Sequence, residues 1–368
     1  MFHEGFGEHV PSGPLRPFRS RQSIRPTHPA RSVRSARSVR SGLAAAALLL
    51  VGALGACTGA PAADESAATS GSGRPAPVSV SSCGVTTTVA APPNRLVTLN
   101  QGATEVALAL GLESRMAGTA YLDDAIPAKW KAAYDSVPVL AKEYPSKEKL
   151  LAAHPDFLYA SYSSAFTDKV AGTQAELRTE GIASYLSRLG CPGGKQAPPP
   201  SFQAVWDELA DVAEVFGVAP RAAAIQKEQK QQLSALEATA AGKDLKVFWY
   251  DSDTKTPYVG AGHGGPQLLL DAVGARNVFG ALPGGWQHAS WEKVIAADPD
   301  VIVLADASWD TAQSKIDYLE HDPVLSKLTA VRHHAFVVVP FSESTPGVLL
   351  ADGAARLSAG LSKVHPRS

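Results

Sequence analysis

The amino-acid sequence predicts an α/β protein with two parallel-sheet lobes, on the basis of a helix–strand unit that occurs twice and a helical tract between the copies. Residues 146–161 return as residues 290–305, and seven of the sixteen aligned positions are identical. Each copy has a Ser suited to capping a helix, a Glu in the first turn, a Pro-Asp stop and an apolar strand. A helix followed by a fully apolar strand is one unit of a parallel sheet, so two distant copies indicate two lobes.

Residues 1–56 are predicted to be a lipoprotein signal peptide rather than part of the fold. Eight arginines lie between Arg16 and Arg40, and an uncharged run follows at 42–56 that is too short to span a bilayer in the usual way. Small residues then precede Cys57, which resembles the cysteine that takes a diacylglycerol. A core helix with a chance Cys is less favoured because nothing amphipathic surrounds it. The first 30 or so residues are long for a signal, which leaves the translation start open.

Removal of the signal peptide changes the net charge. It takes away eight Arg and two Glu, so 26 basic and 33 acidic residues remain and the processed chain carries about −7. A nucleic-acid partner would require a basic face, and none is expected. Residues 57–81 are rich in Ala, Ser, Gly and Pro and are predicted to be a flexible tether.

Two cysteines remain in the folded part, Cys83 and Cys191. Because exported proteins meet oxidising surroundings, we expect a disulfide between the start of the first lobe and its end. Such a bond would close a long loop. Two unpaired thiols are the alternative, and two isolated cysteines give little support for a zinc site.

The N-terminal α/β lobe is assigned to residues 82–200. Short apolar runs predict strands at 95–100, 116–121, 137–140, 157–160 and 182–186. A helix at 106–111 would end at Gly111, and a second is expected at 173–180.

Residues 201–243 are predicted to be a helical connector. A helix at 202–216 places Val205, Leu209, Val212 and Phe216 on one face, and Pro220 begins a second helix that runs to about residue 241. The C-terminal α/β lobe, 244–368, follows with strands at 246–250, 301–304 and 335–339. Its expected helices lie at 267–273, in the second copy of the repeat, and from about residue 348 to the end.

Residues 95–111, the two Ser-x-Glu-Lys copies with their Pro-Asp and apolar strands, and the intervening helical tract resemble the ABC-transporter substrate-binding proteins for ferric siderophores, haem and cobalamin. The resemblance covers essentially all of the folded part. It implies two lobes joined by a long rigid helix, with a ligand cleft between them. It also implies a monomer, held at the extracytoplasmic face of the cell membrane by the lipid on Cys57, that serves an ABC permease dimer with its cytoplasmic ATPase.

The resemblance also assigns a role to one Glu on each lobe. In that family an exposed Glu of each lobe docks onto arginines of the permease, and by motif these positions are Glu148 and Glu292. Paired charges of this kind steer association and fix orientation. The alternative is that both acids only complement a helix dipole. Docking is favoured because a dipole role does not require the same residue in both lobes.

The ligand site is expected in loops at the carboxyl ends of the strands, where open α/β sheets place their crevices. Aromatic side chains offer flat apolar area, and an Arg would suit the negative charge of many ferric complexes. Each candidate could instead pack on its own lobe. The candidates are Asn100, Gln101, Tyr121, Tyr144, Tyr162 and Arg188 from the first lobe, and Trp249, Tyr250, Tyr258, His263, Trp286, Trp309 and Phe341 from the second.

The expected ligand is a ferric siderophore or similar metal chelate, with no resident cofactor or metal. Cobalamin, haem and a deazaflavin-type cofactor precursor remain alternatives. An enzyme is not expected: Ser146 and Ser290 each begin a Ser-x-x-Lys motif, but the Ser-Asp-Asn and Lys-Thr-Gly partners are missing and a catalytic Ser has no reason to occur twice. A binder of free metal ions is less favoured because the histidines at 263, 288, 333 and 334 show no ligand spacing.

Overall fold

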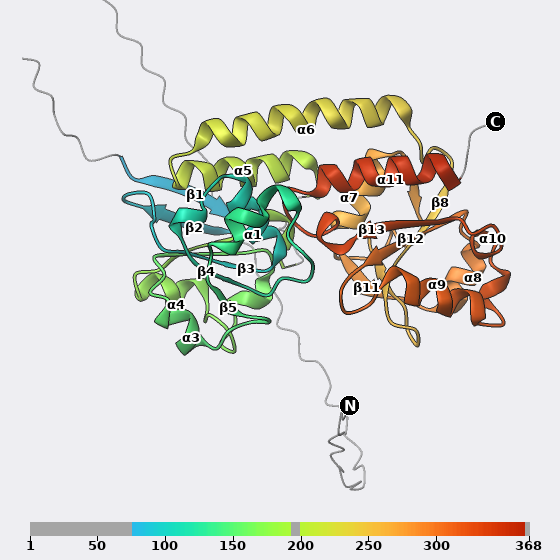
Figure 1. Cartoon of the computed structure of the whole chain (residues 1–368), viewed down its shortest axis with the longest axis horizontal. Helices are drawn as coiled ribbons and strands as arrows, with labels where there is room; N and C mark the ends of the chain where they lie inside the picture. Colours follow the sequence, from blue (N-terminus) through green and yellow to red (C-terminus); the bar gives the residue numbers. More distant parts are fainter. Residues whose placement is uncertain (1–75, 193–198, 365–368) are drawn as a thin grey trace, which may run out of the picture. The chain divides into compact units, whose positions relative to one another are not determined.

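The computed structural model of the chain describes residues 76–192 and 199–364 (Figure 1). The predicted signal peptide, the lipidated Cys57 and the tether up to residue 75 lie outside the described residues. Their roles stay predictions.

The N-terminal lobe is built on a five-stranded parallel sheet in the order β5-β4-β3-β6-β7. All five predicted strands occur. Their bounds are β3 (Leu96–Leu99), β4 (Met116–Ala120), β5 (Val139–Ala141), β6 (Phe157–Ala160) and β7 (Ala183–Leu186). The helices of this lobe are α1 (Gln101–Ala109), α2 (Lys131–Asp135), α3 (Lys147–Ala152) and α4 (Gln174–Thr179).

Every residue of β3 is buried because helices cover both faces of the sheet. Leu96 packs in the cluster that contains Val106 of α1, whereas the next residue, Val97, packs with Leu150 of α3 and Leu177 of α4. Successive side chains of a strand point to opposite faces, so a strand covered on both sides must be apolar throughout. This explains the continuous apolar runs in the sequence.

The lobe begins earlier than predicted, with a hairpin of β1 (Val78–Ser82) and β2 (Val85–Val89). The predicted boundary at residue 82 is therefore wrong, and the tether gives way to a strand at Val78. The sequence did not predict this strand because its Ser and Thr residues give no apolar run. These residues instead form hydrogen bonds with the lobe. Ser82 Oγ donates to the carbonyl of Leu186 at 2.6 Å, and Thr87 Oγ1 donates to that of Ser184 at 2.6 Å.

The connector consists of two antiparallel helices, α5 (Phe202–Val215) and α6 (Ala219–Thr239), which lie side by side (Figure 1). Helix α5 packs on the N-terminal lobe at β1, and α6 packs on α7 and α11 of the C-terminal lobe. A polar chain ties them: Trp206 Nε1 donates to Gln229 Oε1 at 2.9 Å, and Gln229 Nε2 donates to the carbonyl of Val348 at 2.8 Å. The second, 21-residue helix thus fixes one lobe to the other.

The C-terminal lobe contains a mixed sheet in the order β11-β9-β8-β12-β13, with β10 beside β8. Its bounds are β8 (Lys246–Ser252), β9 (Tyr258–Gly260), β10 (Arg276–Asn277), β11 (Trp286–His288), β12 (Val301–Asp306) and β13 (Phe336–Pro340). A purely parallel sheet was predicted, but β9 and β11 pair antiparallel. Each is only three residues long, too short to give a periodic signal.

Helices α7 (Gly265–Ala272), α8 (Trp291–Ala297), α9 (Ala312–His321), α10 (Thr329–Arg332) and α11 (Leu350–Val364) complete the C-terminal lobe. The two copies of the repeat form the same unit, α3–β6 in one lobe and α8–β12 in the other. Ser146 Oγ accepts the Lys149 N–H at 3.3 Å, and Ser290 Oγ accepts the Lys293 N–H at 3.4 Å. Both serines therefore cap helices, as predicted.

Candidate functional site

A cleft of about 760 Å³ lies between the lobes and is lined by residues of both. Eight of the thirteen predicted ligand residues line it: Asn100, Tyr121, Tyr144, Tyr162, Tyr258, Trp286, Trp309 and Phe341. Three of these follow a strand directly. Asn100 comes after β3, Tyr121 after β4 and Phe341 after β13. The carboxyl ends of parallel strands meet at one edge of a sheet, which explains why residues distant in sequence gather here.

The N-terminal wall of the cleft is a connected group of polar aromatic side chains. Asn100 Nδ2 donates to Tyr144 OH at 2.9 Å, and Tyr144 OH lies 2.8 Å from Ser164 Oγ. Tyr121 meets Tyr144 edge-on, with ring centroids 4.6 Å apart. Asn100 and Tyr121 both have left-handed backbones, with φ of 75° and 63°. Such conformations are costly for residues other than Gly and concentrate at functional sites, so this wall is held in a defined shape.

The C-terminal wall carries a cluster of large aromatic side chains. Phe341 lies between Trp309 and Trp286, at centroid distances of 5.6 and 6.3 Å. The Trp309 side chain remains 53% exposed. Large aromatic surfaces on an open wall suit a flat or bulky ligand, because burying them releases water from apolar area.

The cleft also contains charged and polar residues that the sequence analysis missed. They are Asp123, Lys142, Glu143, Ser164, Asp251, Ser252 and Ser308, and the apolar Leu122 lies among them. Burial raises the pKa of Asp251 to about 6, and burial together with Asp124 raises the pKa of Asp123 to about 6. Three acids face one Lys, and no Arg lines the cleft among the described residues. Their place in the sequence could have identified two of the acids: Asp251 directly follows the apolar part of β8, and Asp123 lies three residues after the end of β4.

Four of the predicted ligand residues lie elsewhere because the sheets are covered on both faces. Trp249 and Tyr250 are adjacent in β8 and point to opposite faces, where they are 0% and 1% exposed. Gln101 is buried at the start of α1 and donates to Glu105 at 2.7 Å. His263 is exposed in the loop after β9 but does not line the cleft. The structure therefore does not bring these four side chains into the cleft lining.

A family model described as periplasmic binding protein matches residues 96–343, which span both lobes and the cleft. The chain belongs to the periplasmic binding protein family. This confirms the family resemblance read from the two Ser-x-Glu-Lys copies, and it assigns the chain to the solute-binding components of ABC transport systems.

Individual relatives agree with the family. A relative in Bacillus subtilis (strain 168), the uncharacterized ABC transporter substrate-binding lipoprotein YvrC, is 24% identical over 276 residues, which is 74% of this chain and 81% of the relative. Among solved structures, a periplasmic binding protein from Veillonella parvula is 28% identical with a TM-score of 0.68, covering 77% of this chain and 97% of that one.

A further solved structure, an ABC-type Fe3+-hydroxamate transport system from Saccharomonospora viridis, is 24% identical with a TM-score of 0.67 and covers 79% of this chain and 99% of that one. The periplasmic haem-binding protein RhuT from Roseiflexus sp. RS-1 is 21% identical with a TM-score of 0.59, covering 74% and 99%. These likenesses support the two-lobed α/β fold.

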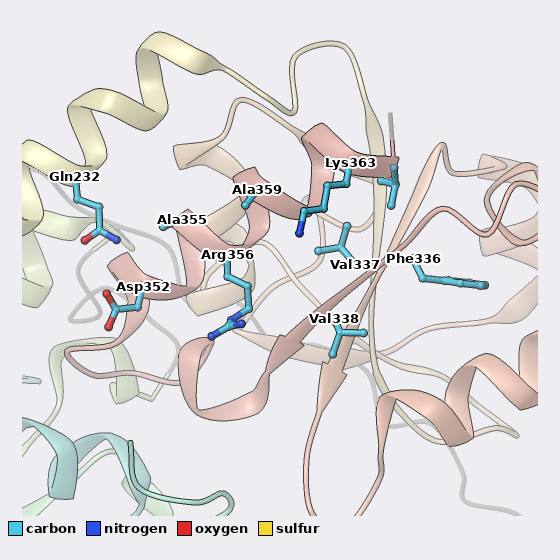
Figure 2. A pocket seen from close by; sticks show the side chains of 11 residues that line it. Gln232, Phe336, Val337, Val338, Asp352, Ala355, Arg356, Ala359 and Lys363 are labelled. Carbon is cyan, nitrogen blue, oxygen red and sulfur yellow. The ribbon is translucent and has the colours of Figure 1, made fainter. Parts of the chain in front are cut away.

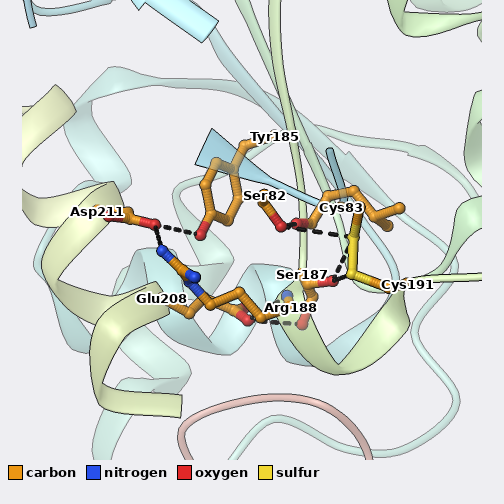
Figure 3. The surroundings of a disulfide bond; sticks show 9 residues. Ser82, Cys83, Tyr185, Ser187, Arg188, Cys191, Glu208 and Asp211 are labelled. Carbon is orange, nitrogen blue, oxygen red and sulfur yellow. Dashed lines mark hydrogen bonds and ion pairs between the residues drawn. A yellow bond between two sulfur atoms is a disulfide. The ribbon is translucent and has the colours of Figure 1, made fainter. Parts of the chain in front are cut away.

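Arg188 was predicted to contact the ligand, but in this periplasmic binding protein it holds the connector (Figure 3). Its Nη2 lies 2.5 Å from Asp211 Oδ2 of α5, and Tyr185 OH donates to the same oxygen at 2.7 Å. The guanidinium is therefore neutralised by a carboxylate outside the cleft. No sequence pattern links Arg188 to an acid 23 residues away, which explains why this pairing was not predicted.

The same region contains a disulfide between Cys83 and Cys191, with an S–S distance of 2.05 Å (Figure 3). The two cysteines are 108 residues apart. Cys83 and Gly84 form the two-residue turn of the β1–β2 hairpin, both with positive φ. The bond thus ties the first hairpin of the chain to the segment after β7.

Glu208 of α5 completes this junction and gives a stability prediction. It is 3% exposed and accepts from Ser187 Oγ at 2.7 Å, from the Arg188 N–H at 2.9 Å and from Tyr159 OH. We expect Glu208→Ala to lower the free energy of unfolding by about 3 kcal/mol, because it leaves buried donors unpaired. Chemical denaturation measures the change.

The matched control is Glu214→Ala, since Glu214 is exposed on the same helix. It should change the free energy of unfolding by less than about 0.5 kcal/mol. Similar values for the two variants would show that the buried hydrogen bonds of Glu208 contribute little.

A second hollow of about 520 Å³ lies between α11 and β13, away from every predicted ligand residue (Figure 2). Figure 2 shows Asp352 and Arg356 projecting from α11. Arg356 pairs with Glu343 through two hydrogen bonds of 2.7 Å, and Asp352 lies 3.3 Å from Lys129 Nζ. Because these charges already have partners, the interlobe cleft is the better candidate for ligand binding.

Glu148 and Glu292 are both exposed in the first turns of α3 and α8. Neither forms an ion pair with another residue in the described part of the chain. A hydrogen bond from its own backbone N–H at the helix N-terminus, and after it one from the Ser146 hydroxyl, lower the pKa of Glu148, so its carboxylate is charged at neutral pH. Each lobe therefore presents one charged, unpaired carboxylate at the same position of the repeated unit.

Within residues 76–192 and 199–364, no group of three or more His, Cys, Asp or Glu side chains is arranged to hold a metal ion. No helix in those ranges is long and apolar enough to cross a membrane.

Proposed function

We propose that this chain is the extracytoplasmic binding lipoprotein of an ABC importer, which captures a ferric siderophore or similar metal chelate and delivers it to the permease. The observation that carries the proposal is the interlobe cleft, lined by aromatic residues from both lobes. Its two walls differ in chemistry, with hydrogen-bonding tyrosines on one side and tryptophans on the other. A metal chelate offers both polar oxygens and apolar chain.

The net charge of the cleft lining favours some metal chelates over others. Asp123, Glu143 and Asp251 outnumber Lys142, so an anionic ligand would be repelled. Three hydroxamates neutralise Fe3+, whereas three catecholates leave the complex with three negative charges and haem carries two propionates. A ferric hydroxamate therefore fits best, in agreement with the Saccharomonospora viridis neighbour named for Fe3+-hydroxamate transport. Haem, cobalamin and a deazaflavin-type precursor are alternative outcomes of the test below.

The remaining features describe how the protein meets the membrane and the permease. A lipid on Cys57 would hold the chain at the outer face of the cell membrane, and the tether would leave the lobes free of the surface. The chain would act as a monomer. Glu148 and Glu292, one on each lobe, would pair with arginines of the two permease subunits, whose ATPase drives import.

The proposal is tested by titrating the full chain, purified in detergent, with a ferric trihydroxamate while Trp fluorescence and binding heat are measured. We expect saturable binding with a Kd on the order of micromolar or tighter, and none with the iron-free trihydroxamate or with Fe3+ alone. Ferric tricatecholate, haem and cobalamin are titrated in parallel. Tight binding of one of these, with no binding of the hydroxamate, would replace the ligand assignment.

Trp309→Ala should weaken binding of the ferric trihydroxamate about tenfold, because a large exposed aromatic side chain on the cleft wall no longer contributes its surface. Since Trp309 is half exposed, its loss should leave the fold intact. Val324→Ala is the control, as Val324 is 50% exposed and lies outside the cleft. Equal affinities for the two variants would argue against this wall as the ligand site.

A further inference from the structure

Asp251 lies at the carboxyl end of β8 and lines the cleft, yet its side chain is almost completely enclosed. The residue is only 2% exposed. Its Oδ2 accepts a long hydrogen bond of 3.3 Å from Ser252 Oγ, and its Oδ1 has no hydrogen-bond partner. A buried carboxylate oxygen without a donor is costly, so a side chain in this state is a candidate for binding a donor from a ligand.

The neighbouring groups of the protein do not satisfy this carboxylate. Lys315 attracts Asp251 electrostatically and opposes the rise of its pKa, but the Lys315 Nζ donates to the carbonyls of Ala305 at 2.6 Å and Asp310 at 2.7 Å rather than to Asp251. Trp286 lies close enough to lower the pKa of Asp251, but its buried Nε1–H falls outside hydrogen-bond geometry. Asp251 therefore keeps an unused acceptor at the cleft.

The inner part of the cleft carries a second acid, Asp123, contributed by the opposite lobe. Tyr162 lies within the electrostatic influence of both: burial raises its pKa well above the usual range, and Asp123 and Asp251 raise it further. The remaining charged residues of the cleft lining, Lys142 and Glu143, are exposed to solvent, and their opposite charges cancel. The interior of the cleft thus has two acids and no cation among its lining residues, although the enclosed Lys315 offsets part of the charge of Asp251.

We propose that the cleft takes a chelate that carries a protonated amine, and that Asp251 receives this ammonium group. This inference rests on the proposed function and makes it more specific: the protein selects its ligands by charge, in the order cationic, neutral, anionic. A single ammonium supplies the hydrogen-bond donor that Oδ1 lacks and the positive charge that the two acids require.

Three ferric chelates with one common iron centre test this selection. The ferric complex of desferrioxamine B, a linear trihydroxamate with a terminal ammonium, carries one positive charge. N-acetylation of the amine makes the complex neutral, and N-succinylation makes it anionic. Binding to the full chain is measured by calorimetry at about pH 8, where the Asp251 carboxyl, with a pKa of about 6, is ionised.

We expect the cationic chelate to bind about tenfold or more tightly than the neutral one, the anionic chelate to bind most weakly, and the differences to shrink as salt is added. Asp251→Asn should reduce the affinity for the cationic chelate to that for the neutral one and leave the neutral one nearly unchanged. The control is Asp253→Asn, which removes the same charge from an exposed position whose φ of 65° suits Asn. It should preserve the selection.

Equal binding of the three chelates by the unmodified chain would overturn the inference and leave the proposed function standing. An equal loss of affinity for all three in Asp251→Asn would also overturn it, since that result indicates a purely structural role. Binding of none of the three would remove the proposed function, and the inference with it. Because the first comparison uses the unmodified chain, it does not depend on whether the variant folds.

Discussion

Replacing Glu148 and Glu292 together by Arg is expected to reduce import of the ligand at least about 100-fold while leaving its affinity for the purified protein unchanged. Both carboxylates are exposed in the first turn of a Ser-capped helix, one on each lobe. Neither has an ion-pair partner within the described residues. If they meet arginines of the permease, reversal places like charges in contact at two points, and each such contact costs several kcal/mol.

The measurement is uptake of radiolabelled ferric chelate by cells in which the variant replaces the native protein. Asp168→Arg with Asp317→Arg is the matched control, because these acids are also exposed, lie one on each lobe and give the same change in net charge. Uptake by the control should stay within about twofold of the native level, as isolated surface charges contribute little. Unchanged uptake with the Glu148 and Glu292 variant would exclude docking through these residues.

Replacing Cys83 and Cys191 by Ser is expected to give the largest loss of stability. The bond closes a loop of 108 residues, for which the chain-entropy relation gives a stabilisation of about 5 kcal/mol. For two lobes of this size we expect the Tm to fall by about 10 °C. Scanning calorimetry of the full chain without reductant measures the change.

Reduction of the unmodified chain with a thiol reagent provides the control for the cysteine substitutions. The reduced native chain should melt at the temperature of the double Ser variant, and the variant itself should not respond to the reagent. A fall in Tm below about 2 °C would mean that the hydrogen bonds of Ser82 and Thr87 hold the first hairpin without the disulfide.

Much of the architecture could be predicted because it follows from local patterns. The strands of the N-terminal sheet are apolar throughout since helices cover both faces, and Ser146 and Ser290 mark their helices by capping chemistry that acts within one turn. The short strands β9 and β11 were not predicted because three residues are too few to show the alternation of apolar and polar residues that marks a strand. The position of Asn100 and Tyr121 in the cleft followed from the strand ends alone.

The errors in the site have a different physical origin. A residue next to a strand end is equally able to face the cleft, the sheet or the other lobe, and only long-range packing decides which. Arg188 faces Asp211 on the connector, and Trp249 is enclosed within its own sheet. Asp251 was missed because it lies within β8 itself. The strand continues past its apolar residues, so a polar residue of the strand, rather than of the loop, lines the cleft.

The disulfide between Cys83 and Cys191 also determines how the molecule bears mechanical load. Tension applied through the polypeptide upstream of Val78 reaches the N-terminal lobe along β1. At Cys83 part of this force passes through the disulfide to the segment after β7. Only the few residue pairs of the β1–β2 hairpin could be peeled apart before the disulfide takes up the force. If the chain is held by its N-terminus during docking, the load therefore enters the N-terminal lobe at its covalently cross-linked hairpin.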